Sequence, residues 1–506
     1  MKKTILSLAS ALVLSSFAKL EKFCDVTIAD STKLVNAATQ IGGFIGDPML
    51  GMMASGMLSA NPMLATLGVG PLRPGAPSHI VVYLDDKKNA DLFSYGVAVL
   101  LYPTQVTKAE CLAALEGAKE VDGAIHPAGM DNMALVFADD VKYVAITGSE
   151  KLNVQLARKS LAALSKMPKL GKVEVLKARL TKFGVQTVAE MAEASQKAIE
   201  DSGMVKIPAV KIQSEEIELL KQIEAIAIAV GVSQRGLDFD CKYFCREGSE
   251  ISKMGSFMKN SSPLAFAGKD ALLAMAWGEN SQGPNVQKRW NEFTKILKKW
   301  GFDLKGVKYV QEGSAAKFTV DLPAMVKYLT GDAQKSFKQL EKDASGEEFF
   351  ADILNLAAKE KEFSSEKAGS IALYVKGVSM PATAQERFAK LMPEYAREPS
   401  IYAGVFSYYS IVKNCAPQVW DVIDADKAKV AMLKGFFESL PAANDADIAF
   451  VWTKKGKLHS FTARISPAEV NGLAKLCSSG MALSHSEVGF DEEADDDDSD
   501  GDDLSK

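Results

Sequence analysis

The sequence predicts an α+β protein made of repeated strand–helix–hairpin–helix modules, in which antiparallel sheets are backed by helices. Short runs of alternating apolar and polar residues are separated by turns rich in Gly and charged residues, a pattern typical of β-hairpins. Capped amphipathic segments follow several of these runs, as expected for helices that cover one face of a sheet. The chain has 506 residues, 47% of them hydrophobic, which suffices for about three domains with ordinary cores.

Residues 1–18 are expected to be a bacterial Sec-type signal peptide. Lys2 and Lys3 precede an uncharged, mostly apolar run, and Ser16 and Ala18 place small residues where a signal peptidase cleaves. The run is too short for a lasting membrane span. The alternative is a buried N-terminal helix, which leaves the two lysines unexplained. We therefore expect a periplasmic or secreted protein that begins at Lys19 after processing.

Residues 19–76 are expected to form a Gly/Ala/Met-rich N-terminal helical segment. No residue between Asp47 and Arg73 is charged, and several methionines fall at mostly helical spacing. Three interpretations are open: two short helices packed on the body with Met as adaptable filler, a soft-metal site, or a membrane-contacting hairpin within residues 36–74. The first is favoured, because residues 36–74 contain no His or Cys to support a metal.

Residues 77–205 are expected to form the first α+β module. Residues 79–84 and 95–102 are strand-like, and Thr107-Lys108-Ala109-Glu110 is a capping box that opens a helix. A hairpin follows, in which residues 133–137 and 141–147 flank a polar turn. A second helix is expected from Ser149 onward.

Residues 206–345 and 346–485 are expected to form two further modules, because the hairpin recurs in both. The predicted pairs are residues 226–232 with 237–245, 307–311 with 316–320, and 448–453 with 458–465. Residues 318–326 also resemble residues 461–470, since each strand runs into a helix with Pro in its first turn. These similarities favour internal duplication over independent origin.

Residues 284–300 predict an amphipathic helix. Its apolar stripe consists of Val286, Trp290, Phe293, Leu297 and Trp300, and its opposite side carries five basic residues. We expect the stripe to pack in the core and the basic side to face solvent. The alternative is contact between this segment and an anionic membrane surface or a partner.

Residues 486–506 are expected to be a disordered acidic tail. The pattern Asp496-x-Asp498-x-Asp500-Gly501-Asp502 matches the first positions of a calcium-binding loop. The later bidentate carboxylate of such a loop has no counterpart. The sequence therefore predicts at most a weak divalent-cation site, for Ca²⁺, formed by Asp496, Asp498, Asp500 and Asp502, and no other cofactor.

Charge is distributed unevenly along the chain. The formal net charge is −5, yet residues 491–506 alone hold ten carboxylates and one lysine. The body is therefore close to neutral, which argues against a nucleic-acid partner.

Six cysteines permit up to three disulfides in an exported chain, or several buried free thiols. Cys241 and Cys245 lie four residues apart on one predicted strand. That separation is roughly 13 Å, too far for a disulfide between them.

The sequence contains no recognised catalytic motif. It has no G-x-S-x-G, H-E-x-x-H, C-x-x-C or phosphate-binding loop, and its four histidines lack metal-ligand spacing. We therefore expect a non-catalytic binding or scaffolding protein of the cell envelope, whose partner is an unknown protein or envelope component. One alternative is a hydrolase with a dispersed active site, in which a Ser or Asp lies beside His126 or His459.

A second alternative is a carrier of an apolar ligand. Ile226, Ile228, Val230 and Val232 alternate with Ala and Gly along one predicted strand. A large cavity lined by aliphatic residues would support that interpretation.

The layout, with Gly236-Leu237-Asp238-Phe239 running into Arg246-Glu247-Gly248-Ser249 and a strand at Pro263-Leu264-Ala265-Phe266, resembles uncharacterised exported proteins of Gram-negative bacteria. The resemblance covers residues 75–480 and implies periplasmic export and repeated α+β modules. It implies no catalytic or binding residue.

Overall fold

The computed structural model describes residues 20–59, 66–85, 96–201, 217–254, 264–281, 283–343, 345–358, 363–420, 422, 427–442 and 444–487. The predicted signal peptide and the aspartates of the predicted cation site lie outside these residues. Both remain predictions.

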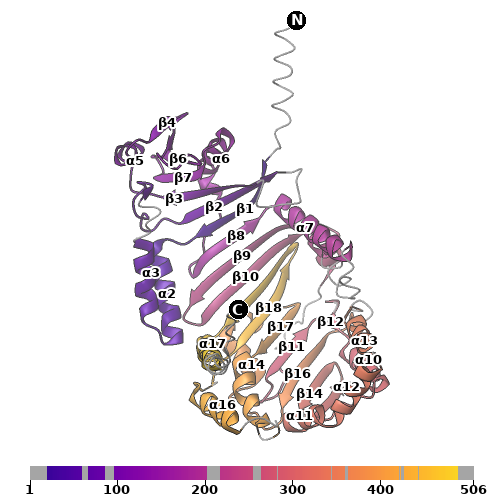
Figure 1. The fold of residues 1–506 in the computed structure, drawn as a ribbon. Coiled ribbons are helices and arrows are strands. Elements are labelled where there is room, and N and C mark those ends of the chain that lie inside the picture. Colours follow the sequence, from indigo (N-terminus) through magenta and orange to yellow (C-terminus); the bar gives the residue numbers. More distant parts are fainter. Residues whose placement is uncertain are drawn as a thin grey trace, which may run out of the picture.

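Helices and one large, mostly antiparallel sheet make up the described part of the chain, so the α+β class is confirmed (Figure 1). In spatial order the seventeen strands of the large sheet are β4 (Lys119–Val121), β5 (Ala124–His126), β6 (Met133–Ala138), β7 (Tyr143–Gly148), β3 (Gly96–Pro103), β2 (Ser78–Asp85), β1 (Leu20–Ile28), β8 (Glu174–Leu180), β9 (Ile223–Ser233), β10 (Gly236–Cys245), β19 (Leu458–Ile465), β18 (Ile448–Lys455), β17 (Tyr402–Phe406), β11 (Leu273–Trp277), β16 (Gly369–Val375), β14 (Ala315–Val320) and β13 (Val307–Glu312). A separate pair joins β12 (Gly283–Pro284) to β15 (Ser364–Ser365).

Helices pack along the edges and faces of this sheet. They are α2 (Ser31–Ile45), α3 (Met49–Ser59), α5 (Lys108–Ala114), α6 (Lys151–Ala162), α7 (Lys182–Asp201), α9 (Glu250–Lys253), α10 (Val286–Lys299), α11 (Leu322–Thr330), α12 (Asp332–Lys342), α13 (Gly346–Ala358), α14 (Ala384–Leu391), α15 (Tyr408–Cys415), α16 (Lys427–Ser439) and α17 (Pro467–Glu487). The described residues also contain three short 3₁₀ turns, η1 (Leu164–Lys166), η3 (Pro393–Tyr395) and η4 (Ala416–Val419). Within the described segments, no helix is long and apolar enough to cross a membrane.

All four predicted hairpins form. They are β6–β7, β9–β10, β13–β14 and β18–β19, and each is antiparallel. The predicted capping box is also present: the Thr107 hydroxyl accepts from the Glu110 N–H, and the Glu110 carboxylate accepts from the Thr107 N–H. Local alternation and capping chemistry therefore suffice to predict these elements.

Three expectations need correction. The strands form one continuous sheet, where the sequence predicted several, and pairing crosses each expected module boundary. Strands β14 and β16 are parallel, because α11, α12 and α13 connect them and return the chain to the same sheet end. Residues 20–28, assigned to a helical segment, form strand β1 between β2 and β8, where the alternating Cys24, Val26 and Ile28 suit a strand.

The expected role of methionine as filler is also wrong for helix α3. Met49, Met52, Met53 and Met57 are all more than half exposed. Helix α3 packs on α2, and α2 in turn contacts α17, β8 and β9.

A buried polar network joins the helices to the C-terminal half of the sheet. The Arg387 guanidinium donates to the Asp447 carboxylate at 2.7 Å and to the Ala271 carbonyl at 2.5 Å. Glu469, fully buried, accepts from the Tyr409 N–H at 2.9 Å and from the Ser407 hydroxyl. Because buried charges are stable only when paired and hydrogen-bonded, this network fixes how α14, α15 and α17 sit on the strands.

Candidate functional site

Apolar residues of ten neighbouring strands lie in register across one face of the sheet. Residues directly opposite one another in a ladder point to the same side, so pairing alone defines this set. From β14 to β1 the row is Ala316, Ile371, Met275, Gly404, Phe450, Ala463, Phe239, Val230, Leu176 and Ile28. A second row beside it is Phe318, Leu373, Leu273, Phe406, Ile448, Ile465, Leu237 and Val232. We call these two rows the apolar face.

The other face of the same strands is either covered or polar. Ala274, Val405 and Ala449 are fully buried beneath Phe388 and its neighbours on α14. On β10 and β19 the same face carries the Asp238–Arg464 ion pair. An ordinary one-layer sheet would turn its apolar side toward a helix and leave its polar side in water.

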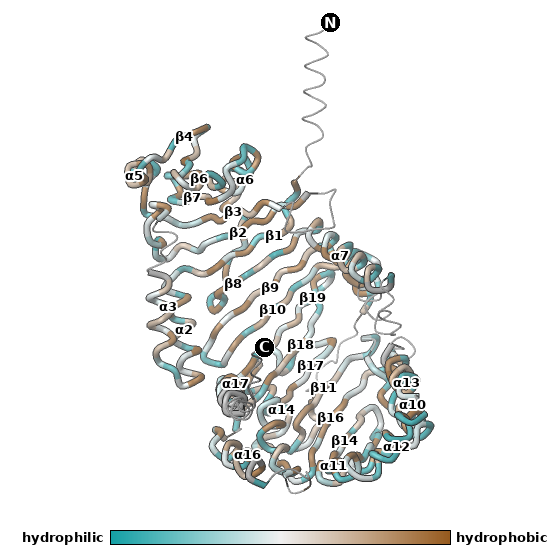
Figure 2. Tube along the Cα trace, viewed as in Figure 1, coloured by the Kyte–Doolittle hydropathy of each residue, from teal (hydrophilic) through white to brown (hydrophobic). Residues whose placement is uncertain are grey.

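The apolar face is only half-buried along much of its length. Phe239 is 39% exposed and Val230 is 36% exposed, and most of the other members are intermediate. Figure 1 shows strands β8, β9, β10 and β18 running without a helix in front of them between α7 at one set of strand ends and α2 and α17 at the other. Figure 2 shows hydrophobic stretches along these strands, whereas α12 is largely hydrophilic. A contiguous, half-exposed apolar surface of this kind is a candidate binding site.

Helices α10 and α13 cover one end of the apolar face. The predicted stripe of α10 packs inward: Trp290 stacks on Tyr309 with ring centroids 5.4 Å apart and meets Phe318 edge-on at 5.1 Å. Leu297 and Phe302 belong to a cluster with Phe349 of α13. The prediction of a core helix is therefore confirmed, because the apolar stripe of α10 packs against other parts of the protein.

A cavity of about 420 Å³ remains between these helices and the sheet. Its lining consists of Pro284, Val286, Arg289, Trp290, Phe293, Phe318, Ile353, Leu356 and Ile371. Phe318 and Ile371 are members of the apolar face, so the cavity continues that surface under the helices. Its size lies within the range of about 300–1,000 Å³ that small-molecule sites occupy.

One charged side chain, Arg289, is among the nine lining residues. Its guanidinium lies 5.9 Å from the centre of the Phe363 ring, and the Lys288 amine lies 5.0 Å from the same ring. A guanidinium beside an apolar pocket suits a carboxylate or phosphate group at the end of an apolar ligand.

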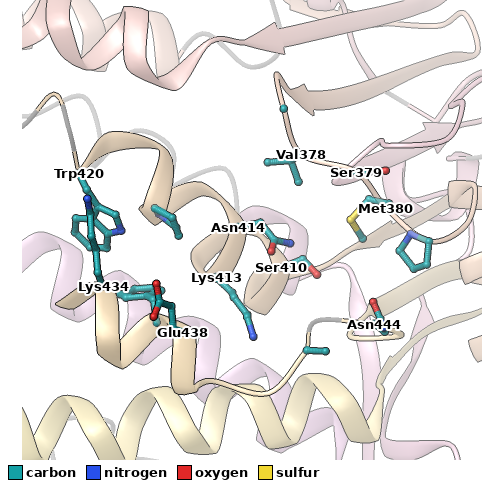
Figure 3. A pocket seen from close by; sticks show the side chains of 15 residues that line it. Val378, Ser379, Met380, Ser410, Lys413, Asn414, Trp420, Lys434, Glu438 and Asn444 are labelled. Carbon is teal, nitrogen blue, oxygen red and sulfur yellow. The ribbon is translucent and has the colours of Figure 1, made fainter. Parts of the chain in front are cut away.

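A larger cavity of about 760 Å³ has mixed walls and lies between α15, α16 and the loop after β16 (Figure 3). Trp420, Lys434 and Glu438 lie at one end of it, and Ser379 and Met380 at the other. Burial lowers the pKa of Lys413, whose amine donates to the carbonyls of Leu440 and Pro441. The backbone therefore engages that amine, and the Ser379 hydroxyl, which also lines the cavity, donates to the Asp270 carboxylate at 2.8 Å.

His126 and His459, the two histidines considered for a dispersed hydrolase site, line neither of the cavities described above. His126 is half-buried at the end of β5. His459 is fully buried, accepts a hydrogen bond from Trp452 Nε1 at 3.2 Å, and stacks on Tyr243. His79 is buried against Thr27, with 2.9 Å between His79 Nδ1 and the hydroxyl. Because Thr27 donates to the Pro168 carbonyl, His79 Nδ1 carries the proton in this pair.

Burial lowers the pKa of His79 to about 4, from 6.5. The unfolded chain therefore binds a proton between pH 6.5 and about 4 that the native state does not bind, so stability falls as pH falls through this window. Replacing His79 with Asn should make the drop in unfolding free energy between pH 7 and 4 smaller by about 3 kcal/mol. Urea denaturation at both pH values measures it.

Asp447 acts in the opposite sense, because burial raises its pKa. Asp447 is present in both the wild type and the His79→Asn variant, so its contribution cancels when the pH dependences of their stabilities are compared. Parallel stability curves for the two proteins would contradict the expectation for His79.

No disulfide forms, and all six cysteines are free thiols. Cys241 and Cys245 are therefore not bonded to each other, as strand geometry requires. In the part of the chain that the structure describes, no group of three or more His, Cys, Asp or Glu side chains could hold a metal ion. The predicted site at Asp496, Asp498, Asp500 and Asp502 is outside that part.

Sequence reasoning found the stripe of α10 and one strand of the apolar face, β9, but neither the cavity nor the face as a whole. The missing information is strand order. Val230 and Phe450 meet the same surface only because β10 and β19 lie between them, and no local pattern encodes that pairing.

Comparison with known proteins adds little. No protein-family model matches the chain, and no curated protein matches it in sequence. Among solved structures, crystal form I of TP0453 aligns with a TM-score of 0.22 and 7% identity, over 45% of this chain and 77% of that one. A likeness this low carries no argument about fold or function. The fold and the site define the chain as an α+β protein with a half-exposed apolar sheet face and an apolar cavity at one end of it.

Proposed function

We propose that the protein is a non-catalytic binding protein of the cell envelope whose ligand contains a hydrocarbon chain. The cavity between α10, α13 and the sheet, which continues onto the half-exposed apolar face, is the observation that carries this proposal. The proposal joins the expected binding role with the apolar-carrier alternative. The described structure offers no observation that favours the hydrolase.

The shape of the surface favours a chain-like ligand over a compact one. Ile371 lines the cavity, and Met275 of the next strand continues the row toward Phe450 and Phe239. An alkyl chain gains about 0.8 kcal/mol for each CH₂ group that it removes from water. With Arg289 in the cavity wall, an anionic head group completes the match, and the ligand class is an amphiphile such as a fatty acid.

Titration with dodecanoate tests the proposal. We expect saturable binding to the wild-type protein and about tenfold weaker binding to Leu356→Gln, because Leu356 lines the cavity and the substitution removes apolar contact worth about 1.5 kcal/mol or more. Isothermal titration calorimetry at constant ionic strength gives both affinities.

Leu329→Gln is the matched control. Leu329 is an exposed leucine on α11 that does not line the cavity, so its replacement should leave the affinity unchanged. Equal weakening in both variants, or no saturable binding to the wild-type protein, would contradict a hydrocarbon site at this position.

Two expectations from the sequence, export and internal duplication, are also proposed here. We propose export by residues 1–18, on the signal-like pattern of that segment. We also propose that the modules arose by duplication. Hairpins β13–β14 and β18–β19 each lead directly into a helix, α11 and α17, with Pro in its first turn, which supports a shared origin.

A further inference from the structure

Helix α3 presents four methionine side chains to solvent, whereas Gly51 on its opposite side is buried. Met49, Met52, Met53 and Met57 occupy one side at helical spacing and are 53%, 60%, 59% and 75% exposed. A helix on the surface of a water-soluble protein has the reverse arrangement, with its apolar stripe turned to the core. We call these four residues the methionine face.

The opposite side of α3 is closely fitted to α2. Gly51 is buried, and a Cβ at this position would overlap the Thr39 side chain of α2. A Cβ at Gly42 of α2 would likewise overlap the carbonyl oxygen of Asp47, where the chain turns into α3. Because this tight contact fixes the rotation of α3, the methionine face cannot turn inward.

The lack of charge and the small area of the methionine face indicate what kind of partner it binds. No residue between Asp47 and Arg73 is charged, so no charged residue of this segment could specify a protein partner. With 11 residues, α3 is about 16 Å long and about 10 Å wide. That footprint is far below the roughly 800 Å² that each partner contributes to a stable protein interface. Flexible, unbranched methionine side chains adapt to an irregular fluid surface.

We propose that the methionine face docks the protein on the surface of a lipid bilayer. Helix α3 lies in the interfacial plane with its methionines among the upper acyl chains, at the shallow depth typical of interfacial helices. The second membrane-facing candidate, residues 284–300, does not supply this contact, because the apolar stripe of α10 is packed against the sheet and α13.

Docking places the bilayer near the open part of the apolar face. Helix α2, which holds α3, contacts β8 and β9, and β9 carries the exposed Val230. The docking inference does not depend on the ligand proposal, since the methionine face and the cavity share no residue. If either the docking inference or the ligand proposal is wrong, the other is unaffected.

Sedimentation with phosphatidylcholine vesicles tests docking with the full chain. We expect the wild-type protein to partition onto the vesicles, and the variant Met53→Gln/Met57→Gln to partition on the order of a hundredfold less. Each substitution of an exposed methionine should lower the partition coefficient at least about tenfold, because it removes apolar surface from the acyl chains. Both side chains are exposed, so the fold should tolerate the change, and an unchanged circular dichroism spectrum checks this.

Met432→Gln provides the matched control, because Met432 is an exposed methionine on α16, outside the methionine face. It should partition like the wild type. Binding should also be insensitive to salt, since the face is uncharged. Three results would overturn the inference: equal partition of the double variant and the control, binding only to anionic vesicles and only at low salt, or a concentration-dependent dimer that the double variant abolishes.

Discussion

Replacing Arg387 with Met is expected to lower the free energy of unfolding by about 3–5 kcal/mol. Arg387 and Asp447 are 4% and 5% exposed, and the 2.7 Å ion pair between them opposes the effect of burial, which raises the pKa of Asp447. Methionine fills similar volume but leaves Asp447 buried without its counter-charge and the Ala271 carbonyl without its donor. Urea denaturation at neutral pH measures the loss.

Lys390→Met on the same helix is the control that separates the effect of burial from the loss of a positive charge. Lys390 also pairs with an aspartate, Asp445, but both side chains are more than half exposed, so the expected change is under about 1 kcal/mol. The double variant Arg387→Met/Asp447→Leu should regain much of the stability, because no buried charge remains. A similar loss in Arg387→Met and Lys390→Met would show that the buried network does not hold α14 on the sheet.

Replacing Gly236 with Ala is expected to cost about 3 kcal/mol or more, because two effects add. Gly236 has φ of +124°, a conformation that side-chain-bearing residues rarely adopt. A Cβ at this position would also overlap the carbonyl oxygen of Ile465 on β19, and the backbone there cannot move without disturbing the ladder. The β10–β19 ladder joins the two halves of the apolar face, so this glycine protects its continuity. Thermal or urea unfolding measures the effect.

Gly456→Ala is the control for backbone strain alone. Gly456 lies in the turn of the neighbouring hairpin with φ of +62°, and a Cβ at this position would have nothing within 4 Å of it. We expect a cost of about 1 kcal/mol. If the two alanine variants lost the same stability, steric fit against β19 would not be the reason for glycine at position 236.

Local patterns in the sequence account for the hairpins, the capping box and the core stripe of α10. Each depends on residues within a few positions of one another, and the alternation of Phe461, Ala463 and Ile465 on β19 shows it directly. The same reasoning failed for β1, whose partners β8 and β2 lie far along the chain. Pairing over such distances depends on the whole set of competing strands.

The candidate site was predicted only in fragments for the same reason. Val230 was one of four apolar residues noted on a strand, but the row that it belongs to also includes residues as distant in sequence as Ile28 and Phe450. The exposed methionines of α3 show the opposite failure. Apolar residues at helical spacing predict a buried face, and here the closely packed Gly51 turns that face outward.

Photo-crosslinking with a diazirine-bearing fatty acid, followed by peptide mapping, tests the central claim most directly. We predict saturable labelling of α10, α13 and β16, with further label along the row that includes Met275 and Phe239, and loss of all this label when excess dodecanoate competes. Label that excess dodecanoate fails to displace, or saturable label confined to segments away from the cavity and the apolar face, would contradict the account.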